Sequence, residues 1–194
     1  MENRILIIGD EILGEQGEAA NRAAEIILCR EANRPIQFSI NAPSPLSLSQ
    51  FMGRASSDII GKKAGRMVMA LGIRELKKDG GEGSVVADSY KKLVELLSKK
   101  IQGSLFFLTI PTDMFPQARY QVEYLNDVIR HFVELDAQRI KIWDLDLQVN
   151  AYKKKQEERG KFARSLFNED GLPTSLGNTF TALYLQDCIL KEIK

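Results

Sequence analysis

Short apolar runs alternate with longer segments of helical periodicity along the whole chain. Five runs rich in β-branched and aromatic residues are typical of buried strands: Ile5–Ile8, Ile36–Ile40, Met67–Leu71, Ser104–Thr109 and Arg139–Trp143. Apolar residues at helical spacing predict helices over Gly17–Ala32, Leu48–Ile60, Ser84–Ile101, Arg119–Leu135 and Leu176–Ile193. Alternating strands and helices predict parallel strands joined by right-handed crossovers. We therefore expect a three-layer α/β/α fold with a five-stranded parallel sheet.

The chain has the size and composition of one domain. Its 194 residues are 44% hydrophobic, which is enough for a core of ordinary size. No repeat, low-complexity tract or Pro/Gly-rich linker divides residues 1–194. The formal net charge of +1 gives no general attraction to nucleic acid or to an anionic membrane.

The cysteines and the N-terminal segment indicate the cellular compartment that we expect for the protein. Cys29 and Cys188 are far apart and make no metal-binding or redox spacing. Each falls on the apolar side of an expected helix, so we predict two buried free thiols in a reducing environment. The N-terminal apolar run is about five residues and acidic residues follow it at once, unlike a signal peptide. No apolar stretch approaches the roughly twenty residues that span a bilayer. We expect a cytoplasmic protein without membrane contact.

A functional crevice is expected at one edge of the sheet. In open α/β sheets, ligands bind outside the carboxyl ends of the strands, where the strand order reverses. The loops at that edge are Gly9–Gly14, Asn41–Ser49, Gly72–Lys77, Ile110–Pro116 and the segment before the last helix.

Blocks at these strand ends resemble the SGNH (GDSL) hydrolase family. Residues Ile7–Ile12 read Ile-Ile-Gly-Asp-Glu-Ile, close to the family's opening block of a hydrophobic residue, Gly, Asp, Ser and Ile. Val68–Leu76 is similar to its third-strand block, and Asp170–Gly177 to the block that opens its last helix. The resemblance spans nearly the whole chain and implies the flavodoxin-like SGNH fold.

The residues for which the family is named are all replaced. Glu11 stands where the family has its nucleophilic serine, and Arg74 where it has an oxyanion-hole asparagine. The last block is one residue short, and the missing residue is the histidine. The second block offers Pro43 and Pro45 in place of a glycine, and proline has no N–H to give an oxyanion. Of the family's catalytic set only Asp170 remains.

One histidine occurs in the whole chain. His131 lies in the middle of an expected helix between the fourth and fifth strands, far from the crevice, so we interpret it as a surface or half-buried helix residue. A serine hydrolase needs both a hydroxyl nucleophile and a base. The sequence therefore argues against hydrolysis by the family mechanism.

Two replacements at the crevice are chemically complementary. The resemblance places Glu11 and Arg74 within a few ångströms of each other, where a carboxylate and a guanidinium favour a charge-assisted pair. We predict that they meet and that each destabilises the protein when removed alone. The candidate pocket residues at this crevice are Asp10, Glu11, Asn41, Gly72, Arg74, Glu75 and Asp170.

Three interpretations of this cluster are open. It is an ion-pair cluster that caps the sheet, a ligand pocket in which Arg74 holds an anionic group, or a site of new chemistry. The third would use Glu11 or Asp170 as a base, or a metal held by Asp10, Glu11 and Asp170. Carboxylates suit a hard cation, but Arg74 among them disfavours one, so we expect no metal and no cofactor.

The function indicated is that of an SGNH-like binding or scaffold protein that has lost its esterase or acylhydrolase activity. Its ligand would be a small molecule or a protein partner of unknown identity. One alternative is an active GDSL-type esterase with atypical residues. Another is a protein that binds RNA or another polyanion through Lys153–Arg164, which we interpret as a helix end with a loop, or a lid. Trp143 is expected in the core.

Overall fold

A computed structural model describes residues 3–44, 46–78 and 82–193. Five strands form one all-parallel sheet in the order β2-β1-β3-β4-β5, the flavodoxin-like order. They are β1 (Arg4–Gly9), β2 (Gln37–Asn41), β3 (Arg66–Ala70), β4 (Ser104–Leu108) and β5 (Ile140–Trp143). This confirms the predicted fold class, and every strand lies within about two residues of its expected place.

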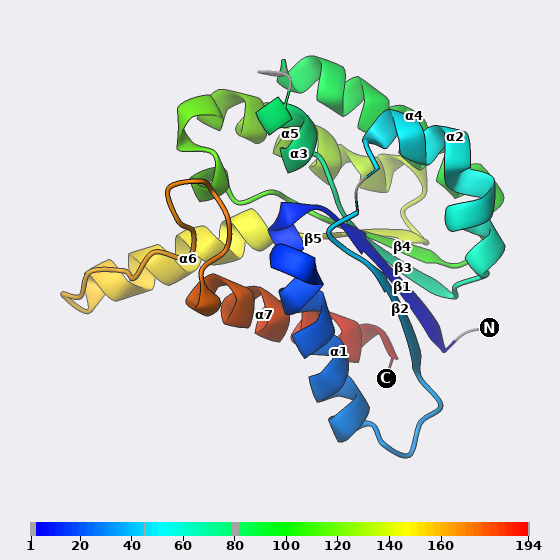
Figure 1. The fold of residues 1–194 in the computed structure, drawn as a ribbon, viewed down its shortest axis with the longest axis horizontal. Helices are drawn as coiled ribbons and strands as arrows, with labels where there is room; N and C mark the ends of the chain where they lie inside the picture. The colour runs from blue at the N-terminus through cyan, green and yellow to red at the C-terminus, as the bar shows by residue number, and fades with distance from the viewer. Residues whose placement is uncertain (1–2, 45, 79–81, 194) are drawn as a thin grey trace.

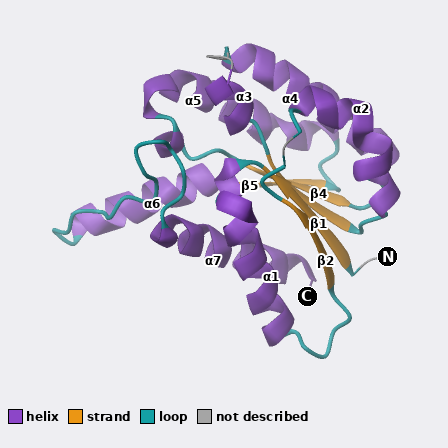
Figure 2. Cartoon of the chain, in the orientation of Figure 1, coloured by secondary structure: helices purple, strands orange, loops and turns teal. Residues whose placement is uncertain are grey.

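Helices cover both faces of the sheet (Figure 2). They are α1 (Glu18–Arg30), α2 (Leu48–Asp58), α3 (Ile73–Lys78), α4 (Gly83–Lys100), α5 (Arg119–His131), α6 (Leu145–Glu158) and α7 (Ser175–Ile193). Helices α1 and α7 pack against each other on one face, and α2, α4 and α5 pack together on the other (Figure 1). Both faces are therefore dry, which explains why the strands read as continuous apolar runs.

The core contains Trp143, as the alternation in the fifth strand predicts. Its side chain is 7% exposed, and its ring stacks on Phe106 of the neighbouring strand with centroids 4.5 Å apart. On the other side of the sheet, Tyr90, Phe107 and Phe132 pack edge to face at 5.2–5.9 Å. Such pairs stabilise beyond the area they bury.

Helices α3 and α6 have no counterpart among the helices that the sequence predicts. Helix α6 begins where the Asp144 carboxylate accepts the Leu147 N–H, and it runs away from the sheet with most of its side chains exposed (Figure 1). A helix that buries only a narrow stripe carries little apolar periodicity. The sequence pattern therefore predicted only its polar end, from Lys153. The segment Lys153–Arg164 is the end of this helix followed by an irregular return.

The prediction of two buried thiols is wrong for Cys29. Its side chain is exposed on α1, and that of Cys188 is partly exposed on α7. Cys29 lies two residues after the buried Ile27, roughly 200° around the helix, so it faces solvent although Ile27 is in the core. In the described part of the chain, no helix combines the length and apolar character needed to cross a membrane.

A matched pair of glycines tests the packing. A methyl group on Gly177, in the first turn of α7, would overlap the Leu166 carbonyl oxygen, whereas one on Gly53 in α2 meets nothing within 4 Å. Gly177→Ala should lower the free energy of unfolding by about 2 kcal/mol. Gly53→Ala should raise it by about 0.5–1 kcal/mol, because alanine restricts the unfolded chain and favours helix. Urea unfolding of both variants checks this, and equal effects would contradict the α7 packing.

Candidate binding crevice

The candidate site lies at the carboxyl ends of β1 and β3, where the sequence predicts a crevice. Strand β1 is flanked by β2 on one side and β3 on the other, so the chain order reverses at β1, where a switch-point site is expected. After Gly9 the chain makes a tight 3-10 turn over Glu11–Leu13 and leaves it through Gly14, whose φ is 83°. A side chain on Gly14 would overlap Asn178 of α7. The turn after β1 therefore packs closely against the last helix, α7.

Asp10 holds the crevice together. Its side chain is 2% exposed, and one carboxylate oxygen accepts the N–H of Ile12 at 3.2 Å. The other accepts three consecutive N–H groups from the turn after β3: Gly72 at 2.9 Å, Ile73 at 2.9 Å and Arg74 at 3.2 Å. These are the free donors at the start of α3. One carboxylate thus ties the turn after β1 to the turn after β3.

Burial sets the proton affinity of this carboxylate. Desolvation, with the neighbouring charge of Glu11, raises the pKa of Asp10 from 3.8 to about 7, although the N–H groups of Ile12 and Arg74 lower it. Burial also raises the pKa of Tyr90, with the charge of Asp10 adding to the effect. Asp10 therefore titrates near neutral pH, and it is the same carboxylate that binds the turn after β3.

Arg74 and Glu75 extend this anchor to the loop after β2. The Arg74 guanidinium donates to the carbonyl oxygen of Ser44. The Glu75 carboxylate accepts the N–H of Leu48, the first residue of α2, at 2.8 Å. Burial raises the pKa of Glu75, and Arg74 beside it opposes this. Both side chains therefore position the wall of the crevice.

The predicted pair between Glu11 and Arg74 is not formed. Among the residues that the structure describes, these two share no ion pair, and Arg74 turns instead to Ser44. The reason is the anchor: Asp10 fixes the backbone of Arg74 at the start of α3, and its side chain then points toward the loop after β2. One carboxylate oxygen of Glu11 is buried and has no hydrogen-bond partner.

The other predicted pocket residues occupy different positions around the crevice. Asn41 ends β2 beside Ile8 and is partly buried, and Gly72 has the positive φ of 118° that its close approach to Asp10 requires. Asp170 is exposed, and only its backbone carbonyl is engaged, by Lys77 Nζ at 2.8 Å. Within the described ranges, no three acidic, cysteine or histidine side chains gather to hold a metal ion. The carboxylate trio Asp10, Glu11 and Asp170 is thus not assembled.

His131 lies where the sequence places it, away from this site. It is exposed in the last turn of α5, and its Nδ1 is 2.6 Å from the carbonyl oxygen of Asp127. Because α5 leads into β5, its end lies at the amino edge of the sheet, opposite the crevice.

A second polar network was missed by sequence reasoning. At the ends of β4 and β5, the Thr109 hydroxyl donates to Asp144 at 2.8 Å, and Thr112 donates to Asp146 through its N–H and hydroxyl at 2.8 and 3.1 Å. Arg130 closes the network on Asp144 at 2.8 Å. The signal was the pair of carboxylates after strand five, Asp144 and Asp146. The hydroxyl, carboxylate and guanidinium groups of this network thus act as one another's hydrogen-bond partners.

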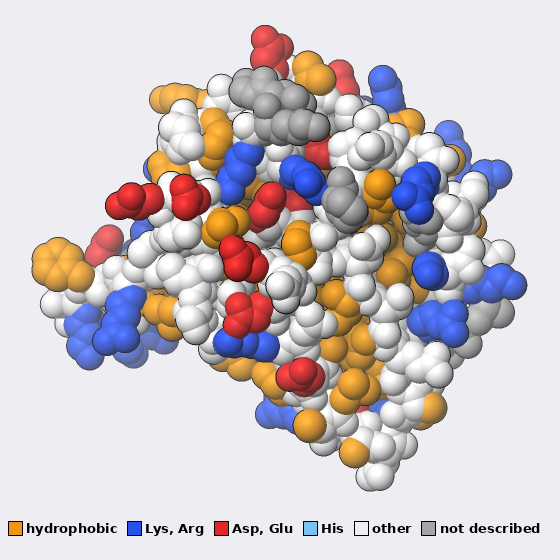
Figure 3. Space-filling model, in the orientation of Figure 1, with side chains coloured by type: hydrophobic (Ala, Val, Ile, Leu, Met, Phe, Trp, Pro, Cys, Tyr) orange, Lys and Arg blue, Asp and Glu red, His pale blue; other side chains and the backbone are white. Residues whose placement is uncertain are grey.

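A hollow of about 370 Å³ lies beside this network, between α6 and the segment Ala163–Glu169. An ion pair between Lys153 and Asp113, at 2.7 Å, closes one side of it. Figure 3 shows acidic side chains over the carboxyl ends of the strands and basic ones over α6. This face thus carries a group of acidic side chains with basic ones beside it.

No family model matches the chain, and no curated protein matches it. Solved structures do match, over nearly their full length. An acetylxylan esterase from Geobacillus stearothermophilus superposes with a TM-score of 0.71 at 14% identity, covering 100% of this chain and 96% of that one. A GDSL-like lipase from Parabacteroides merdae gives 0.75 at 13%, covering 96% and 94%. A lipolytic G-D-S-L family protein from Veillonella parvula gives 0.68 at 16%, covering 97% and 98%.

The fold is that of the SGNH hydrolases. The resemblance carried by the motif blocks is thereby confirmed for the fold, from β1 to α7. The turn at Gly9–Gly14, where the motif resemblance expects the SGNH nucleophile, carries Glu11 in this chain.

The raised pKa of Asp10 predicts a pH dependence of stability. The folded protein holds the Asp10 proton more tightly than the unfolded chain, so its contribution is full below about pH 3.8 and is lost as pH rises through about 7. The free energy of unfolding of the wild type, relative to Asp10→Asn, should fall over this window by at most about 1.4 kcal/mol per pH unit. Urea unfolding from pH 4 to 8 measures it, with Glu15→Gln as the charge control. A difference that rises with pH would contradict the assignment.

The absence of a Glu11–Arg74 pair predicts additivity. Glu11→Ala removes a carboxylate with an unpartnered oxygen and should change stability little, whereas Arg74→Ala loses the bond to Ser44. In a double-mutant cycle the two effects should add within about 0.5 kcal/mol. A coupling well above that value would show that the two charges meet in solution.

Proposed function

We propose that the chain is a non-hydrolytic SGNH-fold protein that binds a ligand in the crevice between the turn after β1 and α3. The observation that carries this is Glu11: a carboxylate, with one buried and unpartnered oxygen, occupies the tip of the SGNH nucleophile turn. A carboxylate there does not readily form the acyl-enzyme ester that a serine hydroxyl forms.

The lack of a base supports the same conclusion. The chain has one histidine, and His131 lies on α5 at the other edge of the sheet. Pro173 and Thr174 occupy the segment before α7 where SGNH enzymes carry theirs, and the neighbouring Asp170 is exposed with no imidazole to orient. Proton transfer by a positioned base contributes orders of magnitude to such reactions.

Other hydroxyl groups at this edge are committed to structure. The Ser44 side chain is buried, and its oxygen accepts the N–H of Leu46 at 3.2 Å. Thr109 and Thr112 bond to Asp144 and Asp146. None of these three is a free nucleophile beside a base.

The charges of the crevice indicate the kind of ligand. Glu11 offers an unsatisfied acceptor, and an unsatisfied buried acceptor costs free energy that a hydrogen-bond donor would recover. We infer a polar small molecule that donates a hydroxyl or ammonium hydrogen to Glu11. Because relatives in fold include acetylxylan esterases, xylo-oligosaccharides are reasonable first ligands for a binding assay.

The proposal predicts no turnover of short acyl esters or of acetylated xylo-oligosaccharides. Without nucleophile and base, and with the residues of the oxyanion hole replaced, residual catalysis from binding alone should be slight. Glu11→Ser should not restore activity, because no histidine activates the new hydroxyl. Release of p-nitrophenol and of acetate measures both.

One outcome favours the alternative of an active esterase. Turnover that survives repurification and vanishes in Glu11→Gln would show carboxylate-based catalysis and would overturn the proposal. Glu15→Gln, which removes an exposed carboxylate in the next turn, serves as the matched control.

A further inference from the structure

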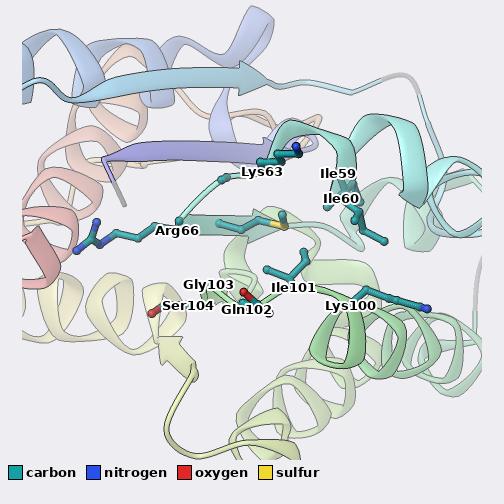
Figure 4. Close-up of a pocket in the computed structure, with 12 residues that line it drawn as sticks. Ile59, Ile60, Lys63, Arg66, Lys100, Ile101, Gln102, Gly103 and Ser104 are labelled. Atoms are coloured by element: carbon teal, nitrogen blue, oxygen red, sulfur yellow. The ribbon is translucent and has the colours of Figure 1, made fainter. Parts of the chain in front are cut away.

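A hollow of about 640 Å³ opens at the amino edge of the sheet, opposite the crevice. It lies where β3 and β4 begin, between the segment that follows α2 and the end of α4 (Figure 4). Its volume is within the range of pockets that hold small molecules. None of the residues of the proposed binding crevice lines it, so it is a separate site.

The inner surface of this hollow is apolar. Ile59, Met67 and Ile101 are buried side chains of the core that reach its lining, and Ile60 is partly exposed there. Figure 4 shows Ile101 in the middle of the hollow, with Ile59 and Ile60 on one side. Such a lining favours the apolar body of a ligand, since burying it releases water from both surfaces.

The charges around the hollow have one sign. Lys63 and Lys100 lie on opposite sides of it, and no lining residue is acidic (Figure 4). Neither lysine forms an ion pair with any residue in the described ranges. The third cation of the lining, Arg66, extends away, and its guanidinium donates to the Glu192 carbonyl at 3.0 Å. Among the residues that line the hollow, an anion would therefore meet two lysines and no carboxylate.

The lysines are not needed to neutralise the helix ends. Cations are favoured at helix C-termini, and α4 ends beside the hollow, but its last carbonyls already have a partner. Arg139 donates to the carbonyl oxygens of Ser98 and Ile101, while its charge is balanced by Asp136. The ammonium group of Lys100 is therefore available to a ligand at the rim of the hollow.

The backbone at Lys63 is held in an uncommon conformation. Its φ of 49° and ψ of 44° are left-handed, which costs a residue with a Cβ about 1 kcal/mol relative to glycine. Such strain persists where the surrounding structure fixes it, and it often marks a functional position. In this chain the strained residue is Lys63, one of the two lysines at the hollow.

We propose that this hollow binds an amphipathic monoanion: an apolar body against Ile60, Met67 and Ile101, with a carboxylate, sulfonate or phosphate head between Lys63 and Lys100. The apolar lining accounts for the body and the two unpaired ammonium groups for the head. The proposal does not depend on what the crevice at the opposite edge does.

The probe is 1-anilinonaphthalene-8-sulfonate, an apolar body with one anionic head whose fluorescence rises on burial. It should bind the wild type saturably, and decanoate should displace it while 1-decanol at equal concentration does not. Lys63→Gly and Lys100→Gln should each weaken probe binding about two- to fivefold, as expected for exposed charge pairs.

Each variant has a matched control. Lys62→Gln and Lys99→Gln remove the same charge from the adjacent residue, outside the lining, and should keep wild-type affinity. Lys63→Gly suits the left-handed backbone, so it should not lower the thermal midpoint, and lost binding cannot be ascribed to unfolding. The proposal is overturned if the probe does not bind, if decanol competes as well as decanoate, or if the control variants weaken binding as much as the test variants.

Discussion

A single buried carboxylate determines the shape of the carboxyl edge of this sheet. Parallel strands fix only the direction in which the chain leaves the sheet, and the loops beyond them need their own hydrogen bonds. Asp10 supplies these by accepting four backbone N–H groups, one from its own turn and three from the start of α3. Without it, those donors would be left in a dry environment, which is costly.

The rest of the crevice is built outward from this anchor. Because the backbone of Arg74 is fixed, its guanidinium reaches the loop after β2, and Glu75 caps α2 from the next position. The walls are thus held largely by bonds to main-chain groups. The side chain of Glu11 takes no part in them, so these bonds do not specify which residue stands at the tip of the turn.

Most of the architecture could be predicted from the sequence because dry parallel strands leave continuous apolar runs. Helix α6 could not, since its mostly exposed surface carries little periodicity, and Cys29 was misplaced because it faces away from the side of α1 that buries Ile27. The Glu11–Arg74 pair failed for a third reason. A resemblance locates backbone positions, but the direction of a long side chain depends on the competing acceptors around it, here the Ser44 carbonyl.

The anchoring role of Asp10 divides the SGNH opening block into two parts under different constraints. In this chain the Gly-Asp half is a requirement of folding: Gly9 lets the chain turn under Ala70 and Leu13, and Asp10 binds the main chain. The third residue is free to vary without loss of the fold. A strand that ends in Gly-Asp is thus informative about architecture whatever follows it, whereas the third residue bears on the chemistry of the turn.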